Sequence, residues 1–233
     1  MLFRSKPRDA CHFGRQTANH HPSRPMRDCK PGERLHSDVC HATVKSLRGT
    51  DKFVTMKHEA SGYRMVRFIK STKEVRESLV AMMDEAERVT GRKAVSVRTD
   101  NGTEYTNAEV RELLAKVDHE SSAPYVKQGN GIAERENRIL CDTARSLLHH
   151  TDLTRTEKRL LWAEAVAVAA YIRNRVPNNR TGNRITPFEM WYGYKPDLSF
   201  MRVFGCPAFT FRMRSEASSI QRVGRRCSSD TTA

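Results

Sequence analysis

The sequence predicts an α/β domain in which helices flank a mixed sheet. Three short strand-like runs follow one another near the start of the chain, and two further runs alternate with helical segments. Two long helical segments come next. This order is typical of a layered α/β or α+β domain, and 233 residues are enough to bury a substantial core.

The first three predicted strands lie close together in the sequence. They cover residues 34–44, 52–56 and 63–69, and turn-forming stretches such as Ser61-Gly62 separate them. Because parallel neighbours need a crossover of about a dozen or more residues, these short connections favour an antiparallel meander.

A helix and a fourth strand follow the meander. Ser71 and Glu74 have the spacing of a capping box, and apolar residues then recur at helical spacing until Gly91 ends the helix. Apolar residues alternate over residues 93–99, which predicts a short buried strand that closes in a turn at Asp100.

The second half of the domain is mostly helical. Thr106 and Glu109 form another capping-box spacing, which predicts a short helix before a brief strand over residues 117–121. Beyond the following loop we predict two long helices, over residues 132–150 and 156–175.

The chain is strongly basic. Its 41 Lys and Arg residues against 27 Asp and Glu residues give a net charge of +14, and the isoelectric point is about 9.9. This charge indicates a polyanionic partner, nucleic acid first and an acidic membrane surface second, with a basic but inert surface as the alternative. Much of the excess lies in an arm before Leu35 and a tail after Phe211.

Several classes of protein are excluded at this stage. The most apolar run, residues 160–172, is too short to span a bilayer and contains Glu164. The start of the chain lacks the apolar stretch of a signal peptide, and the six cysteines have no regular spacing. We therefore expect an intracellular protein with reduced thiols and no membrane partner.

Three acidic residues stand at the ends of predicted elements. Asp38 lies in the first strand, Asp100 ends the fourth, and Glu134 lies in the first turn of a long helix. If those strands are neighbours, the carboxylates converge and need a cation to offset their repulsion. Hard oxygen ligands suit Mg²⁺ or Mn²⁺, which act in phosphoryl displacement. The alternative is three unrelated surface acids, caps or turn formers.

Several segments resemble the catalytic core of integrases from copia-type retrotransposons. The similarity is collinear from about residue 35 to residue 211. The matching segments are 36–40 (HSDVC), 98–105 (RTDNGTEY), 130–138 (NGIAERENR), 162–166 (WAEAV), 186–193 (TPFEMWYG) and 202–206 (RVFGC).

This resemblance implies a fold, an activity and partners. The fold is ribonuclease H-like, with a mixed five-stranded sheet. Asp38, Asp100 and Glu134 match the D,D,E triad, which binds two Mg²⁺ or Mn²⁺ ions when DNA is bound. The implied activity is polynucleotidyl transfer, in which 3′-end processing precedes strand transfer into target DNA. DNA as the partner, a homo-oligomer and a nuclear location follow from the same resemblance.

The third acid of the triad is ambiguous. Between Asp100 and Glu134 lie 33 residues, two fewer than the usual spacing of the family, and Glu136 would restore that spacing. The local pattern Gly-x-Ala-Glu-Arg favours Glu134. Residues two apart on a helix point about 200° apart, so only one of them can face the metal ions. We predict that it is Glu134.

Five residues are predicted to bind DNA: Lys127, Gln128, Asn137, Arg138 and Arg145. The first two lie in the loop before the long helix, where the family has Tyr-x-Pro-Gln and this chain has Lys127 in place of proline. Asn137 and Arg138 match a position that the family uses near the element's end. Arg138 and Arg145 share a helical face with Glu134, where they could meet phosphates. A solvated basic face is the alternative.

The resemblance divides the chain into four parts. Residues 1–33 are expected to be a disordered basic arm left from a zinc-binding module, 34–178 the catalytic core, 179–211 its C-terminal extension and 212–233 a disordered tail. Cys11 resembles the last cysteine of that module, but its other ligands are missing and we do not expect zinc.

Two functions therefore stay open. One is an active or latent metal-dependent integrase core, in a truncated copy of a Pol polyprotein. The other is a catalytically inactive, domesticated or decayed remnant that binds nucleic acid. Cleavage of RNA in hybrids shares the fold and the metal ions but fits these motifs poorly.

Overall fold

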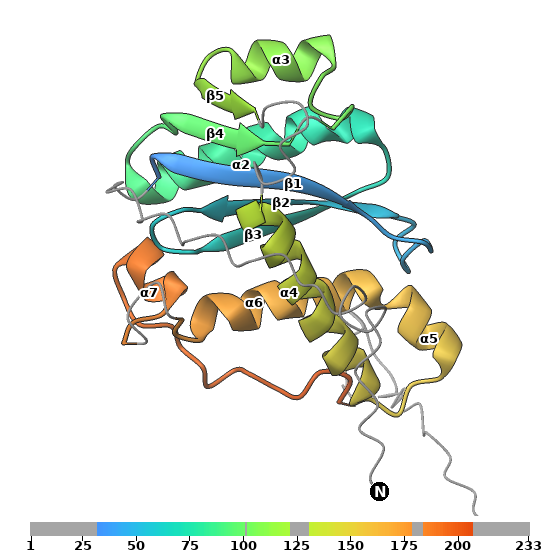
Figure 1. The fold of residues 1–233 in the computed structure, drawn as a ribbon. Helices are drawn as coiled ribbons and strands as arrows, with labels where there is room; N and C mark the ends of the chain where they lie inside the picture. The colour runs from blue at the N-terminus through green and yellow to red at the C-terminus, as the bar shows by residue number, and fades with distance from the viewer. Residues whose placement is uncertain (1–31, 101, 122–130, 179–183, 207–233) are drawn as a thin grey trace, which may run out of the picture.

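A five-stranded sheet forms the centre of the fold, and helices cover both of its faces (Figure 1). The computed structural model describes residues 32–100, 102–121, 131–178 and 184–206. Within these residues the predicted mixed sheet flanked by helices is confirmed.

The strands are arranged in the order β3-β2-β1-β4-β5. The strands β1 (Arg34–His41), β2 (Lys52–His58) and β3 (Arg64–Ile69) form the predicted antiparallel meander. Parallel strands β4 (Ser96–Thr99) and β5 (Asp118–Ser121) extend the sheet beyond β1. The first strand is therefore central, with an antiparallel neighbour on one side and a parallel neighbour on the other.

One face of the sheet packs against α2 (Val75–Thr90), and α3 (Ala108–Leu114) adjoins it. Gly91 ends α2 with φ 68°, a left-handed conformation that glycine adopts readily. The buried apolar cluster on this face includes Leu35, Val54, Met56, Leu79, Met82, Val97, Val110 and Leu114. Most of the predicted apolar stripe of α2 is thus part of the core.

The two helices on this face begin differently from the prediction. Ser71 caps a short 3₁₀ turn, η1 (Thr72–Glu74), but the Glu74 carboxylate accepts a hydrogen bond from the backbone before Ser71 rather than from Ser71 itself. Asn107, not Thr106, caps α3, because the Thr106 hydroxyl donates to a carbonyl of the preceding turn. Both predicted capping boxes were therefore wrong, although both helices exist.

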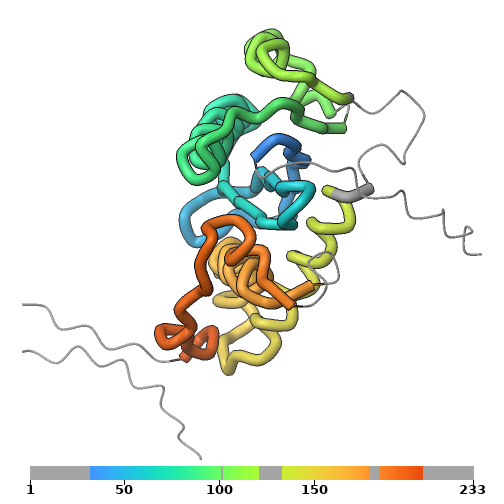
Figure 2. The backbone as a smooth tube through the Cα atoms, turned by 90° about the vertical axis from the view of Figure 1, so that its left-hand side faces the viewer, coloured from blue at the N-terminus to red at the C-terminus, as the bar shows by residue number. Residues whose placement is uncertain are grey.

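The opposite face packs against α4 (Gly131–His149) and α6 (Trp162–Arg175). Figure 2, turned by 90°, shows the sheet between α2 on one side and α4 on the other. The apolar cluster on this face includes Phe53, Leu140, Ala144, Ala165, Val166 and Ala169.

The helix predicted over residues 156–175 is broken. A reciprocal capping box at Thr154 starts α5 (Arg155–Leu160), and α6 begins after Leu161. The carbonyl of Leu160 accepts a hydrogen bond of 2.7 Å from the backbone of the β1–β2 loop. This tertiary contact takes the place of an intrahelical bond, which local sequence patterns cannot reveal.

Residues 184–206 return along the outside of α6. The short helix α7 (Pro187–Tyr192) buries Trp191 in the α2-side cluster, and Phe204 packs against the α4-side cluster. The predicted division into core and extension stays a prediction, and residues 1–31 and 207–233 lie outside the described part of the chain. Among the described residues, no helix is both long and apolar enough to cross a membrane.

Candidate active site

Asp38, within β1, and Asp100, directly after β4, lie toward the same end of the sheet. The parallel strands β1 and β4 pair with His36 opposite Arg98, and each aspartate lies two residues further along. Glu134 lies in the first turn of α4, which packs against β1, and its side chain is exposed. The condition set by the sequence, that the first and fourth strands are neighbours, is therefore met.

Asp100 and Glu134 both act electrostatically on Asp38. Burial, with smaller contributions from the negative charges of Asp100 and Glu134, raises the pKa of Asp38 to about 6 from an ordinary value of 3.8. Hydrogen bonds from the Val39 backbone at 3.0 Å and from Asn137 at 2.7 Å act in the opposite direction. The structure thus brings all three carboxylates within electrostatic reach at one edge of the sheet.

Glu136 points away from this edge and into the core. It is buried, and its two carboxylate oxygens pair with the Lys57 ammonium of β2 and the Arg64 guanidinium of β3. Burial alone would raise the pKa of Glu136, but these two cations outweigh it and lower the pKa. The residue that would restore the usual family spacing is therefore occupied in a structural ion pair, and Glu134 is the acid near Asp38.

A tyrosine supports the loop that carries Asp100. Tyr105 is buried, and its hydroxyl is 3.0 Å from the Ser37 hydroxyl, next to Asp38 in β1. Burial raises the pKa of Tyr105 well above its ordinary value, so the phenol stays neutral. The contact ties the segment after β4 to β1.

The donor chemistry of this edge fits a hard divalent cation. Burial, together with the nearby charges of Asp100 and Glu134, raises the pKa of Asp38, and a cation would offset both effects. As they stand, no three His, Cys, Asp or Glu side chains within the described residues form a group able to hold a metal ion. Asp38, Asp100 and Glu134 are nevertheless the residues that would supply the oxygens.

The predicted DNA-binding residues fall into three groups. Lys127 and Gln128 lie outside the described residues. Arg138 and Arg145 are exposed on α4, and Arg145 pairs with Asp142 at 2.8 Å. The fifth residue, Asn137, is buried and hydrogen-bonded within the site, and its contact with DNA stays a prediction.

Sequence analysis missed the inward direction of Glu136 and Asn137. A signal was available, because the apolar residues Leu140 and Ala144 form a stripe along this helix and both missed residues precede them by helical spacing. Extending that stripe toward the start of α4 would have placed both side chains in the core. The partners of these two residues on β2 and β3 could not have been found without the sheet.

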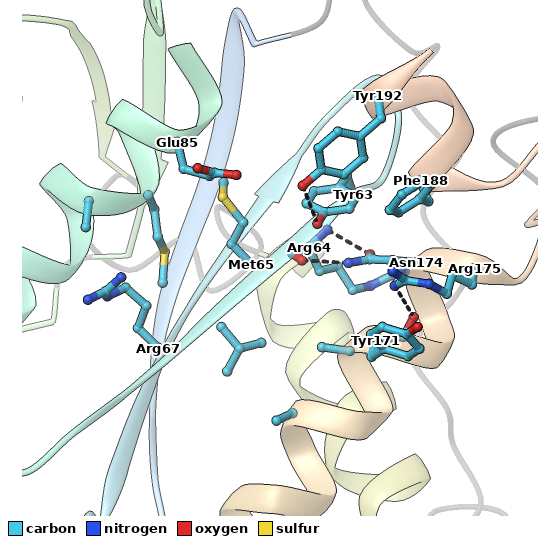
Figure 3. A pocket seen from close by; sticks show the side chains of 15 residues that line it. Tyr63, Arg64, Met65, Arg67, Glu85, Tyr171, Asn174, Arg175, Phe188 and Tyr192 are labelled. Carbon is cyan, nitrogen blue, oxygen red and sulfur yellow. Dashed lines mark hydrogen bonds between the residues drawn. The ribbon is translucent and has the colours of Figure 1, made fainter. Parts of the chain in front are cut away.

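A separate pocket lies away from the carboxylates. It has a volume of about 370 Å³ and is bordered by β3, α2, α6 and α7. Its aromatic side chains include Tyr63, Tyr171, Phe188 and Tyr192 (Figure 3). None of the three acids lines it, so it is not part of the candidate active site.

Known proteins with similar sequences are Pol polyproteins. The chain is 34% identical over 207 residues to the retrovirus-related Pol polyprotein from transposon TNT 1-94 of Nicotiana tabacum. It is 25% identical over 202 residues to the retrovirus-related Pol polyprotein from transposon RE1 of Arabidopsis thaliana. The chain is a homologue of retrotransposon Pol polyproteins. These matches cover 88% and 87% of the chain but span only 15% and 13% of the two polyproteins. No protein-family model matches it.

A solved structure is similar to this chain in its fold. A chain of the simian T-cell lymphotropic virus intasome, in complex with PP2A regulatory subunit B56 gamma, matches with a TM-score of 0.56 and 18% identity, covering 90% of this chain and 72% of that one. The catalytic core domain of BIV integrase matches with a TM-score of 0.48 and 20% identity, covering 69% and 93%. The Pol homologue has the ribonuclease H-like fold that the sequence predicted.

Proposed function

We propose that this chain is the catalytic core of a retrotransposon integrase, which joins DNA ends to target DNA by metal-dependent polynucleotidyl transfer. The observation that supports the proposal is that Asp100 and Glu134 lie within electrostatic reach of Asp38, while Glu136 is held in the core. The homology to Pol polyproteins supports it. DNA as the partner, assembly into homo-oligomers and a nuclear location belong to the same proposal.

The reaction exchanges phosphodiester bonds. In end processing, water attacks a phosphorus near the 3′ end, a new P–O bond forms, and the bond to the departing 3′ oxygen breaks. In strand transfer, the freed 3′ hydroxyl attacks target DNA in the same manner. Two Mg²⁺ or Mn²⁺ ions held by Asp38, Asp100 and Glu134 would stabilise charge on the attacking and leaving oxygens. Arg138 and Arg145 would hold phosphates.

The direct test is disintegration, the reversal of strand transfer, on a branched oligonucleotide. We expect product that requires Mg²⁺ or Mn²⁺ and that disappears in Asp38→Asn and Asp100→Asn. Thermal melting of each variant shows whether it is folded. Product no greater than that of Asp38→Asn would overturn the proposal.

A second candidate is a DNA-binding protein without catalysis. It is favoured by the finding that no three potential ligands in the described part of the chain are already grouped around a metal site. This candidate predicts salt-sensitive, sequence-independent DNA binding and no disintegration product. Affinity that does not change with salt would exclude it.

A further inference from the structure

A buried asparagine connects the first carboxylate of the site to the neighbouring strand. Asn137 of α4 donates from Nδ2 to Asp38 Oδ2 at 2.7 Å. Its Oδ1 accepts from the Thr55 hydroxyl of β2 at 2.9 Å. Thr55 stands directly opposite Asp38 in the β1–β2 register, and its hydroxyl is also 3.3 Å from the Asp38 carbonyl oxygen. Three elements therefore meet at one carboxylate.

The chemistry of these groups fixes the direction of the two hydrogen bonds. An ionised carboxylate can only accept, so the amide nitrogen of Asn137 must face Asp38. The amide oxygen then faces Thr55, whose hydroxyl can donate to it. Without that hydroxyl, the amide oxygen of Asn137 would lose the hydrogen bond that helps to hold this orientation.

Each carboxylate oxygen of Asp38 accepts one hydrogen bond, and each can still accept another ligand. Oδ1 accepts from the Val39 backbone at 3.0 Å and Oδ2 accepts from Asn137. Because each carboxylate oxygen carries two lone pairs, each keeps one for another ligand. The plane of the carboxylate is thus set while it remains able to bind a cation.

A second buried asparagine shows what a purely structural role looks like in this protein. Asn174 of α6 is 4% exposed, against 5% for Asn137, and it also makes two hydrogen bonds. Both of them, at 2.9 and 2.8 Å, join it to the backbone of Arg64, and they fasten α6 to β3 (Figure 3). Asn174 touches no carboxylate of the site.

We propose that Asn137 and Thr55 are positioning residues, which hold the Asp38 carboxylate in the orientation that binds the divalent cation. This inference rests on the proposed function, because it takes Asp38 to be a metal ligand. Groups that orient a metal ligand typically change metal affinity by about 10–100-fold when they are removed. Asn137 then serves the site from within the core, whereas DNA is left to the exposed residues of α4.

The test measures Mn²⁺ binding to the metal-free full-length chain, with free Mn²⁺ read from its electron paramagnetic resonance signal. Thr55→Val and Asn137→Leu remove the hydrogen bonds at nearly constant volume, and we expect each to weaken Mn²⁺ affinity by about 10-fold or more. Thr55→Ser, which keeps the hydroxyl, should restore the affinity. Asn174→Leu is the matched control: it should lower the melting temperature and leave Mn²⁺ affinity unchanged.

The outcomes separate this inference from the proposed function. If Asp38→Ala abolishes Mn²⁺ binding but Thr55→Val and Asn137→Leu do not weaken it, the inference is wrong and the metal site stands. If Asp38→Ala leaves binding unchanged, both are wrong. Should Asn137→Leu fail to fold, Thr55→Val decides. An equal loss of affinity in Asn174→Leu would show a general loosening of the core and would also contradict the inference.

Discussion

Asp38 combines two requirements that oppose each other. Its carboxylate must be ionised to bind a cation, but burial and the nearby Asp100 charge penalise ionisation and raise its pKa to about 6. The hydrogen bonds from Val39 and Asn137 offset only part of this penalty. In the metal-free protein the ionised site therefore destabilises the fold.

This penalty gives the metal-free protein a characteristic pH dependence. Between about pH 4 and pH 6 the folded state binds a proton that the unfolded chain releases, so this group lowers the free energy of unfolding as the pH rises. Asp38→Asn removes the effect and should stabilise the protein at about pH 7.5 relative to about pH 4.5, by at most about 3 kcal/mol. Denaturant unfolding with a chelator present measures it.

Asp142→Asn, which alters an exposed carboxylate on α4, provides the control. Its effect on the free energy of unfolding should be small and the same at both pH values. If Asp38→Asn changes the free energy of unfolding as little as this control does, ionisation of Asp38 does not destabilise the folded protein.

The sequence could suggest the three acids of the candidate site, but not the residues that hydrogen-bond to them. Asp38, Asp100 and Glu134 could be named because they lie within a strand, directly after a strand and in the first turn of a helix. Thr55 could not, because its importance comes from lying opposite Asp38, and strand register is a property of the folded sheet. Asn137 was identified as a functional position, but its partners depend on how α4 is rotated against the sheet.

The rotation of α4 about its own axis decides which of its side chains face the sheet. Glu136 inserts between Lys57 and Arg64 and fixes which side of α4 faces the sheet. Glu134 is two residues away, about 200° around the helix. The same ion pairs therefore direct Glu134 toward the end of the sheet that carries Asp38 and Asp100. A buried structural pair thus helps to select the functional acid.

Breaking this pair should destabilise the protein strongly. Glu136→Gln removes the negative charge that pairs with two buried cations, and we expect the free energy of unfolding to fall by about 3 kcal/mol. Glu112→Gln changes an exposed glutamate, 4.0 Å from Lys116, and should cost less than about 0.5 kcal/mol. Urea titrations of both variants compare the two; similar losses would mean that Glu136 does not hold α4.

The elements themselves were largely predictable, and their ends were not. The five strands follow from short runs of strand-forming residues between turns and helices. The helix before Gly91 follows from apolar residues at helical spacing. The helix starts at Ser71 and Asn107 depend on which of several neighbouring polar side chains reaches a free backbone group. The break at Leu161 depends on a hydrogen bond from a distant loop. Local patterns therefore establish an element more reliably than its boundary.

In the whole molecule, the excess positive charge and the three candidate acids lie in different parts of the chain. Residues 1–31 and 207–233 contain 12 of the 41 Lys and Arg residues but only 4 of the 27 Asp and Glu residues. More than half of the net charge of +14 thus belongs to these two ends. The net charge indicates the class of partner, whereas the acids of the sheet edge indicate the reaction.

The salt dependence of DNA binding can locate the contact surface. If Arg138 neutralises a phosphate, Arg138→Gln should reduce the slope of log K against log salt by about 0.9 for duplex DNA. Arg88→Gln alters an exposed arginine on α2, across the sheet from α4, and should leave the slope unchanged. Fluorescence anisotropy over a series of salt concentrations measures both; equal slopes for the two variants would place DNA elsewhere.

The central claim is that Glu134, and not Glu136, completes the catalytic site. The disintegration rates of Glu134→Gln and Glu136→Gln test it most directly, measured with Mg²⁺ or Mn²⁺ at a temperature where both variants are folded. We predict that Glu134→Gln is folded and forms no product, while Glu136→Gln is less stable and still turns over. Product from Glu134→Gln, with none from folded Glu136→Gln, would contradict the claim.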